Sequence, residues 1–141
     1  MGKHKAFIQN PFPEILEELS LARLGSFSKH RRMSVFLTLG TTCVCCGRQA
    51  TRILKTRDNG GGIHIDIYAN KMLMTIDHIL PKVKGGRNHI SNYQILCEKC
   101  NITKDSHEVS LEELRVLVSE NVRYFEVSAR LASLRTSYAT V

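Results

Sequence analysis

The stretch that decides the fold is residues 75–104, TIDHILPKVKGGRNHISNYQILCEKCNITK. It holds an aspartate next to a histidine, a Gly-Gly loop, three asparagines and, near its end, a Cys-x-x-Cys pair. Carboxylates and amides bind cations and an imidazole transfers protons, while a Cys-x-x-Cys pair is half of a tetrahedral zinc site. The stretch therefore predicts two metal roles, one structural and one chemical.

The second half of the zinc site lies upstream, where residues 43–47 read CVCCG. Zinc prefers cysteines separated by two residues, so the predicted ligands are Cys43, Cys46, Cys97 and Cys100. Four thiolates leave zinc no open position, which predicts a structural ion that does not bind substrate. Cys45 permits another register, in which it replaces Cys43 or Cys46, and is otherwise a spare thiol. The 50 residues between Cys46 and Cys97 are more than an ordinary zinc ribbon has between its two cysteine pairs. The predicted zinc site therefore encloses a larger structural unit.

Charge is unevenly distributed along the 141 residues, whose net charge is +7. Residues 1–57 carry ten basic and three acidic side chains, residues 58–104 six and four, and residues 105–141 four and six. A basic excess upstream of the motif and beside it predicts a polyanionic partner, which we expect to be a nucleic acid. The length and a hydrophobic content of 43% fit one packed domain.

No apolar segment has the length of a signal peptide or a membrane span. The longest candidate, Val35–Leu39, is short and contains Thr38. We therefore expect a cytoplasmic protein with no membrane partner. In such a reducing compartment five cysteines are better explained as metal ligands and one spare thiol than as disulfides. The oligomeric state and the preferred DNA sequence stay open.

Caps and hydrophobic periods predict helices on both sides of the motif. A proline followed by apolar residues at helical spacing predicts a helix over residues 13–24. A second helix is expected over residues 28–39, ending at Gly40. Residues 110–113 form a capping box, and apolar residues recur at helical spacing as far as Ala132, which predicts one long C-terminal helix.

The middle of the chain reads as strands. Residues 63–68 alternate strictly and residues 72–76 have a strand-like composition, which predicts a β-hairpin. A long loop, a short strand near residues 93–96 and a helix beginning close to Cys97 should follow. The expected organisation is a single domain over residues 1–141, with a helical extension at 1–42, a zinc-bracketed core at 43–104 and a C-terminal helix at 105–141.

The combined motifs of residues 43–104 resemble the HNH endonucleases, the ββα-metal or His-Me finger group found widely in phages and mobile elements. That family's pattern has Asp-His-Ile-x-Pro, a Gly-Gly loop, Asn-x-Gln, and Cys-x-x-Cys-Asn or Cys-x-x-Cys-His followed by Lys. The matching segments here are residues 77–81, 85–86, 92–94, 97–101 and 104. The resemblance implies an α+β fold in which a β-hairpin, a ββα-metal core and a structural zinc site are flanked by helices. It also implies a bacterial or phage-infected host cell.

The motif residues suit hydrolysis of a phosphodiester, which needs an activated water and neutralisation of charge on the phosphoryl and leaving oxygens. A neutral His78 imidazole suits the role of general base. Asp77 and Asn101 suit one divalent ion, and their sparse oxygen ligands favour magnesium or manganese. By resemblance, Asn101 stands where the family name has a histidine, Asn92 ties the loop that orients the base, and cleavage leaves 5′-phosphate and 3′-hydroxyl ends.

One condition on this site concerns the strand that carries it. Consecutive residues of a strand face opposite sides, so Asp77 and His78 share a site only if the strand ends or twists there. Pro81 is consistent with such an end.

Basic side chains around the motif are candidate phosphate contacts, namely Lys82, Lys84, Arg87 and Lys104, with Arg31 and Arg32 as secondary candidates. The main alternative to an endonuclease is a non-catalytic zinc-dependent DNA-binding module with the same basic surface. Such a module has no reason to assemble Asp77, His78 and Asn101. A thiol redox protein would need a thioredoxin-like βαβ pattern, which the sequence does not have.

Overall fold

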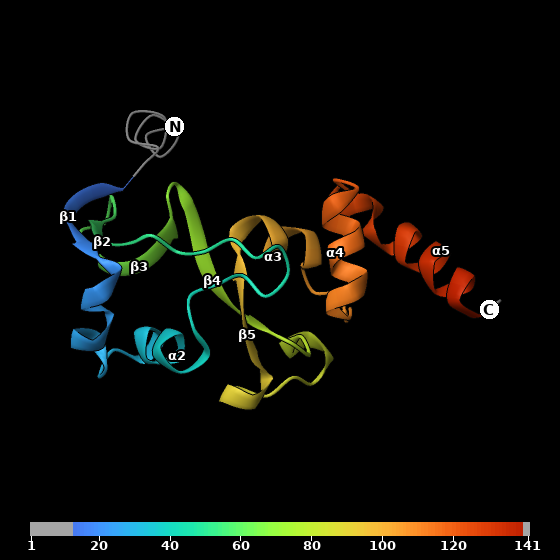
Figure 1. Cartoon of the computed structure of the whole chain (residues 1–141), viewed down its shortest axis with the longest axis horizontal. Coiled ribbons are helices and arrows are strands. Elements are labelled where there is room, and N and C mark those ends of the chain that lie inside the picture. Colours follow the sequence, from blue (N-terminus) through green and yellow to red (C-terminus); the bar gives the residue numbers. More distant parts are fainter. Residues whose placement is uncertain (1–12, 140–141) are drawn as a thin grey trace.

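The structure is a computed structural model that describes residues 13–139 (Figure 1). Five antiparallel strands form a sheet in the order β1-β2-β3-β4-β5. They are β1 (Glu14–Ser20), β2 (Arg52–Arg57), β3 (Ile63–Ala69), β4 (Met72–His78) and β5 (Tyr93–Cys97). The α-helices are α2 (Arg31–Leu39), α3 (Glu98–Lys104), α4 (Leu111–Ser119) and α5 (Val127–Ala139). The predicted α+β class is confirmed, while residues 1–12 of the predicted N-terminal extension lie outside the described residues.

The predicted β-hairpin is present as β3 and β4. Its turn pairs Ala69 with Met72, and Asn70 takes the left-handed conformation, with φ of 54°, that a two-residue turn favours. β4 then pairs with β5 from Met74 to His78. The predicted short strand near residues 93–96 is β5, and the helix expected to begin near Cys97 is α3.

The predicted helix over residues 13–24 is wrong. This segment forms β1, which pairs with β2, and then the 3-10 helix η1 (Leu21–Phe27). Glu18 of β1 meets Arg52 of β2 at 3.3 Å. Backbone pairing and opposite charges across two strands outweigh the helical spacing of a few apolar residues in this exposed segment.

The second predicted helix is α2, which begins three residues later than expected. His30 is its N-cap, because its Nδ1 accepts a hydrogen bond of 3.3 Å from the backbone N–H of Met33. Gly40 ends the helix with φ of 96°, as predicted. Met33 and Phe36 are fully buried and anchor α2 to the rest of the core.

The predicted long C-terminal helix is interrupted. The capping box of residues 110–113 opens α4, but α4 ends at Ser119. Asn121 has φ of 54°, and the N–H of Val122 donates to the carbonyl of Leu117, an arrangement that closes a helix. The 3-10 helix η4 (Tyr124–Glu126) leads into α5, and both α-helices lie at the end of the molecule away from β1 (Figure 1). Over residues 13–139, no helix combines the length and apolarity that crossing a membrane requires.

Candidate functional site

Four cysteine thiols converge from the loop before β2, the end of β5 and α3. The Sγ atoms of Cys43, Cys46, Cys97 and Cys100 all lie within 4.8 Å of one another, and those of Cys46 and Cys97 are 3.7 Å apart. Four Zn–S bonds of about 2.3 Å in a tetrahedron place the sulfurs about 3.8 Å apart, so the cluster fits a zinc ion. Cys45 is not part of this group, which favours the register with the standard spacing.

Hydrogen bonds within the loop and from two elements, β5 and α4, shape the cysteine loop of residues 43–47. Gly47, with φ of 80°, donates its N–H to the carbonyl of Cys43 at 2.9 Å and so closes the turn. The N–H of Val44 donates to Ile95 of β5 at 2.9 Å. Arg115 of α4 donates to the carbonyl of Val44 at 2.9 Å. The two halves of the cluster are therefore held together by the protein as well as by any ion.

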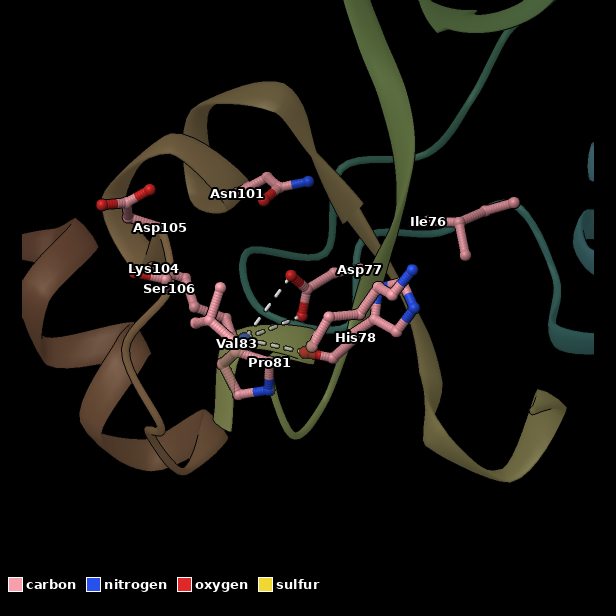
Figure 2. A pocket seen from close by; sticks show the side chains of 10 residues that line it. Ile76, Asp77, His78, Pro81, Val83, Asn101, Lys104, Asp105 and Ser106 are labelled. Carbon is pink, nitrogen blue, oxygen red and sulfur yellow. Dashed lines mark hydrogen bonds and ion pairs between the residues drawn. The ribbon is translucent and has the colours of Figure 1, made fainter. Parts of the chain in front are cut away.

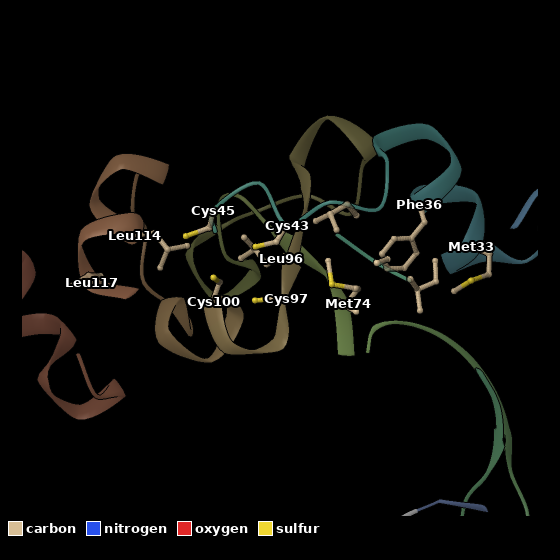
Figure 3. Close-up of a cluster of buried hydrophobic side chains, with 14 of the residues drawn as sticks. Met33, Phe36, Cys43, Cys45, Met74, Leu96, Cys97, Cys100, Leu114 and Leu117 are labelled. Atoms are coloured by element: carbon tan, nitrogen blue, oxygen red, sulfur yellow. The ribbon is translucent and has the colours of Figure 1, made fainter. Parts of the chain in front are cut away.

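Three of the four cluster cysteines, Cys43, Cys97 and Cys100, belong to the hydrophobic core between Leu114 of α4 and Phe36 of α2 (Figure 3), whereas Cys46 is exposed. The neighbouring Cys100 thiol and burial raise the pKa of Cys43 to about 12. The thiol is therefore protonated at neutral pH when no metal is bound. Because zinc binds thiolates, metal binding at this cluster must release protons.

A second site lies where β4 ends against α3. A pocket of about 300 Å³ is lined by Asp77 and His78 of β4, by Asn101 and Lys104 of α3, and by the loop segment 81–83 (Figure 2). β4 ends at His78, but Asp77 and His78 both still pair regularly with β5, so the end of the strand does not turn the two side chains to one side. The structure nevertheless brings the three side chains with predicted chemical roles to the border of one pocket.

The carboxylate of Asp77 is only 7% exposed and has two partners at one oxygen. Lys104 Nζ lies 3.1 Å from Oδ2, and Gln94, directly opposite on β5, donates to the same atom at 3.0 Å. Lys104 also donates to the carbonyl of His78 at 2.9 Å and is 1% exposed. The expectation that Lys104 contacts phosphate is therefore corrected, since its ammonium is buried against Asp77 and ties α3 to the end of β4.

We expect Lys104→Met to destabilise the zinc-loaded chain by about 3–5 kcal/mol, because it leaves the Asp77 carboxylate buried without its counter-charge. Adding Asp77→Asn to the same chain should recover part of the loss, because the amide carries no charge. Urea unfolding of the wild type, both single variants and the double variant measures the coupling. Additive losses would show that the two side chains do not interact.

Asn101 is oriented by a hydrogen bond to the strand. Its Nδ2 donates to Thr75 Oγ1 at 2.7 Å, and Thr75 lies two residues before Asp77, on the same face of β4. No hydrogen bond to Asn101 Oδ1 is recorded within residues 13–139. A carboxylate has about four lone-pair positions, so Asp77 can accept a cation in addition to its two partners. These oxygen donors fit a hard divalent cation such as magnesium.

The imidazole of His78 points away from the Asp77 carboxylate (Figure 2), as expected for consecutive strand residues. His78 Nε2 lies 2.8 Å from Asn88 Oδ1, and its ring packs edge-on against Tyr93 with ring centroids 5.2 Å apart. An amide oxygen can only accept, so Nε2 carries the proton and Nδ1 is left as an acceptor. Neither Asn88 nor Gln94 had been assigned a role from the sequence, although Gln94 stands in the Asn-x-Gln motif.

Asn92 fastens the loop between β4 and β5. Its Oδ1 accepts from the N–H of Leu80 at 2.8 Å, and its Nδ2 donates to the carbonyls of Leu80 and Arg87 at 3.0 and 3.1 Å. The loop tie that the resemblance implied is therefore present. The loop also crosses itself closely, because a Cβ on Gly86 would lie 1.7 Å from the carbonyl oxygen of Leu80. Glycine is required there for space.

Three of the candidate phosphate contacts are exposed on this loop: Lys82, Lys84 and Arg87. Lys82 also lines the pocket that holds Asp77 and Asn101. Their contact with DNA stays a prediction.

Comparison with known proteins finds one similar family for the segment that holds this site. Residues 66–112 match the family model described as HNH endonuclease. No curated protein and no solved structure matches the chain. The matched residues include β4, β5 and α3, whereas α2 and the first cysteine pair lie outside them. The match indicates a nuclease or nucleic-acid-binding role. The segment that builds the pocket, residues 66–112, is therefore similar to the HNH endonucleases.

Proposed function

We propose that this chain is a metal-dependent endonuclease that hydrolyses phosphodiester bonds in DNA. The observation that carries the proposal is that Asp77, His78 and Asn101 border one pocket inside the segment that matches the HNH endonuclease family. The succession of β4, β5 and α3 along the chain supports a ββα-metal core. A DNA-binding module without catalysis would not need these three side chains at one pocket.

His78 is the proposed general base. Its Nε2–H donates a hydrogen bond to Asn88 Oδ1, so the unprotonated Nδ1 atom is the one that accepts a proton from the attacking water. Tyr93 and Asn88 restrict the ring to this orientation, while Asn92 keeps the loop that carries Asn88 in place. A positioned base of this kind contributes roughly 100- to 10,000-fold to a rate.

Asp77 and Asn101 are the proposed ligands of a magnesium or manganese ion, which when bound supplies positive charge to the phosphoryl and leaving 3′ oxygens. Lys104 and Gln94 lie closest to Asp77 Oδ2, so Oδ1 is the oxygen we assign to the cation. Lys82, Lys84 and Arg87 are the proposed phosphate contacts on the neighbouring loop. The cysteine cluster is proposed to hold a structural zinc ion, because four thiolates leave no open position.

Supercoiled plasmid is expected to be nicked or linearised by the zinc-loaded chain when magnesium or manganese is added. Weakly bound cations should be removed by gel filtration, because a strong chelator would also strip the cysteine cluster. DNA ligase alone should reseal the nicks if the ends carry 5′-phosphate and 3′-hydroxyl groups. DNA binding without cleavage in any metal would favour the non-catalytic DNA-binding module instead.

A further inference from the structure

We propose that a groove beside His78, walled by α2, receives one strand of the DNA substrate next to the phosphate that is cut. This inference rests on the proposed endonuclease function. The groove has a volume of about 650 Å³ and lies between α2, β4 and the loop before β5. Ile76 and His78 line both this groove and the pocket that holds Asp77 and Asn101. A strand lying in the groove therefore passes the proposed base.

The rim of the groove is cationic. Arg31 and Arg32 of α2 line it, and no acidic side chain does. Arg32 donates to Asp66 of β3 at 2.6 Å, which fixes the start of α2 to the sheet. Arg31 is exposed, and no ion pair is recorded for it in the part of the chain that the structure describes. Its guanidinium is therefore available to a phosphate, on a helix that is held rigidly.

The floor of the groove is apolar. Val35 of α2, Ile76 of β4 and Ile90 of the loop line it, next to Tyr93 of β5. Ile90 is 37% exposed, so the floor is open to a ligand. Sites for nucleic-acid strands combine positive charge along the backbone with apolar or aromatic surfaces under sugars and bases. The rim and the floor together fit a DNA strand by charge and polarity.

The contribution of α2 is the new element of this inference. The helix lies outside residues 66–112, so the family match says nothing about it. Met33 and Phe36 are 0% exposed and anchor its inner face, while Arg31 and Val35 turn toward the groove. Two basic side chains of the N-terminal part of the sequence, Arg31 and Arg32, are thereby brought into the groove that His78 also lines, although they are distant from the motif along the chain.

Arg31→Glu and Lys71→Glu are the matched pair of variants that tests whether the groove binds DNA. Lys71 is exposed at the turn between β3 and β4, at the end of β4 away from His78, and both changes alter the net charge equally. Glutamate suits the first residue of a helix, so Arg31→Glu should leave α2 intact. Fluorescence anisotropy of a labelled DNA duplex with each zinc-loaded chain, without magnesium, gives the affinity over a range of salt concentrations.

We expect Arg31→Glu to weaken binding severalfold and to reduce the slope of log Kd against log salt by about 1, as loss of one phosphate contact does. Lys71→Glu should keep the wild-type slope. Equal effects of the two variants, or no effect of Arg31→Glu, would overturn the proposal that the groove binds DNA, while leaving the endonuclease proposal intact. A wild-type chain that neither binds nor cuts DNA would overturn both.

Discussion

The His78→Ala chain is expected to cut plasmid about 100- to 10,000-fold more slowly than the wild type, while its zinc content and folding persist. The imidazole contacts Asn88 and Tyr93 at the end of β4 and is not a member of the cysteine cluster. Removing it therefore takes away the proposed proton acceptor without opening the core. The measurement is the initial nicking rate at saturating magnesium, together with zinc content and the unfolding temperature.

A second histidine provides the matched control. His64 lies on β3, is half-exposed and pairs with Asp58 at 2.6 Å, away from the pocket at the end of β4. We expect His64→Ala to cut at the wild-type rate. Undiminished cutting by His78→Ala would remove the assignment of the base. An equal loss in both variants would also count against it, since it would mean that histidine removal acts indirectly.

Cys97→Ser is expected to lose zinc and most of the stability of the fold together. Cys97 is fully buried, at the point where β5 passes into α3, and its thiol belongs to the four-cysteine cluster. Structural zinc contributes apparent binding energies of about 10–16 kcal/mol in small zinc domains, so loss of one ligand should exceed any ordinary core substitution. Zinc content and thermal unfolding of the same purified sample test the two losses together.

Cys45→Ser is the control for this experiment. Cys45 is also buried, but its thiol lies outside the cluster, so the variant should keep its zinc. A Cys97→Ser chain that folds normally without zinc would contradict the structural role of the cluster. Loss of zinc from Cys45→Ser would instead point to the alternative register, in which Cys45 is a ligand.

The elements that the sequence predicted well depend on neighbouring residues. The hairpin follows from strict alternation and a two-residue turn at Asn70, and α4 begins where the capping box of residues 110–113 predicts. β1 could not be predicted in this way, because its pairing partner β2 is more than 30 residues further along the chain. The break after α4 depends on the left-handed conformation of Asn121, which apolar spacing does not reveal.

In the candidate site, too, some residues could be predicted from the sequence and others could not. Asp77, His78 and Asn101 could be selected from the motif, and the structure places them around one pocket. The role of Lys104 could not be predicted, because a lysine near a basic motif looks like a surface charge until α3 is seen to bury it. Asn88 gave no signal, since its contact with His78 depends on the path of the loop.

The most direct test of a cation held at Asp77 is the initial rate of plasmid nicking over a magnesium titration, for the wild type and for Asp77→Asn, with zinc content matched. We predict that the wild-type rate rises from a background near zero to a plateau, and that the variant needs far more magnesium or never reaches that plateau. Two results would contradict a cation held at Asp77: nicking by the wild type that does not depend on the added metal, or identical titration curves for the two chains.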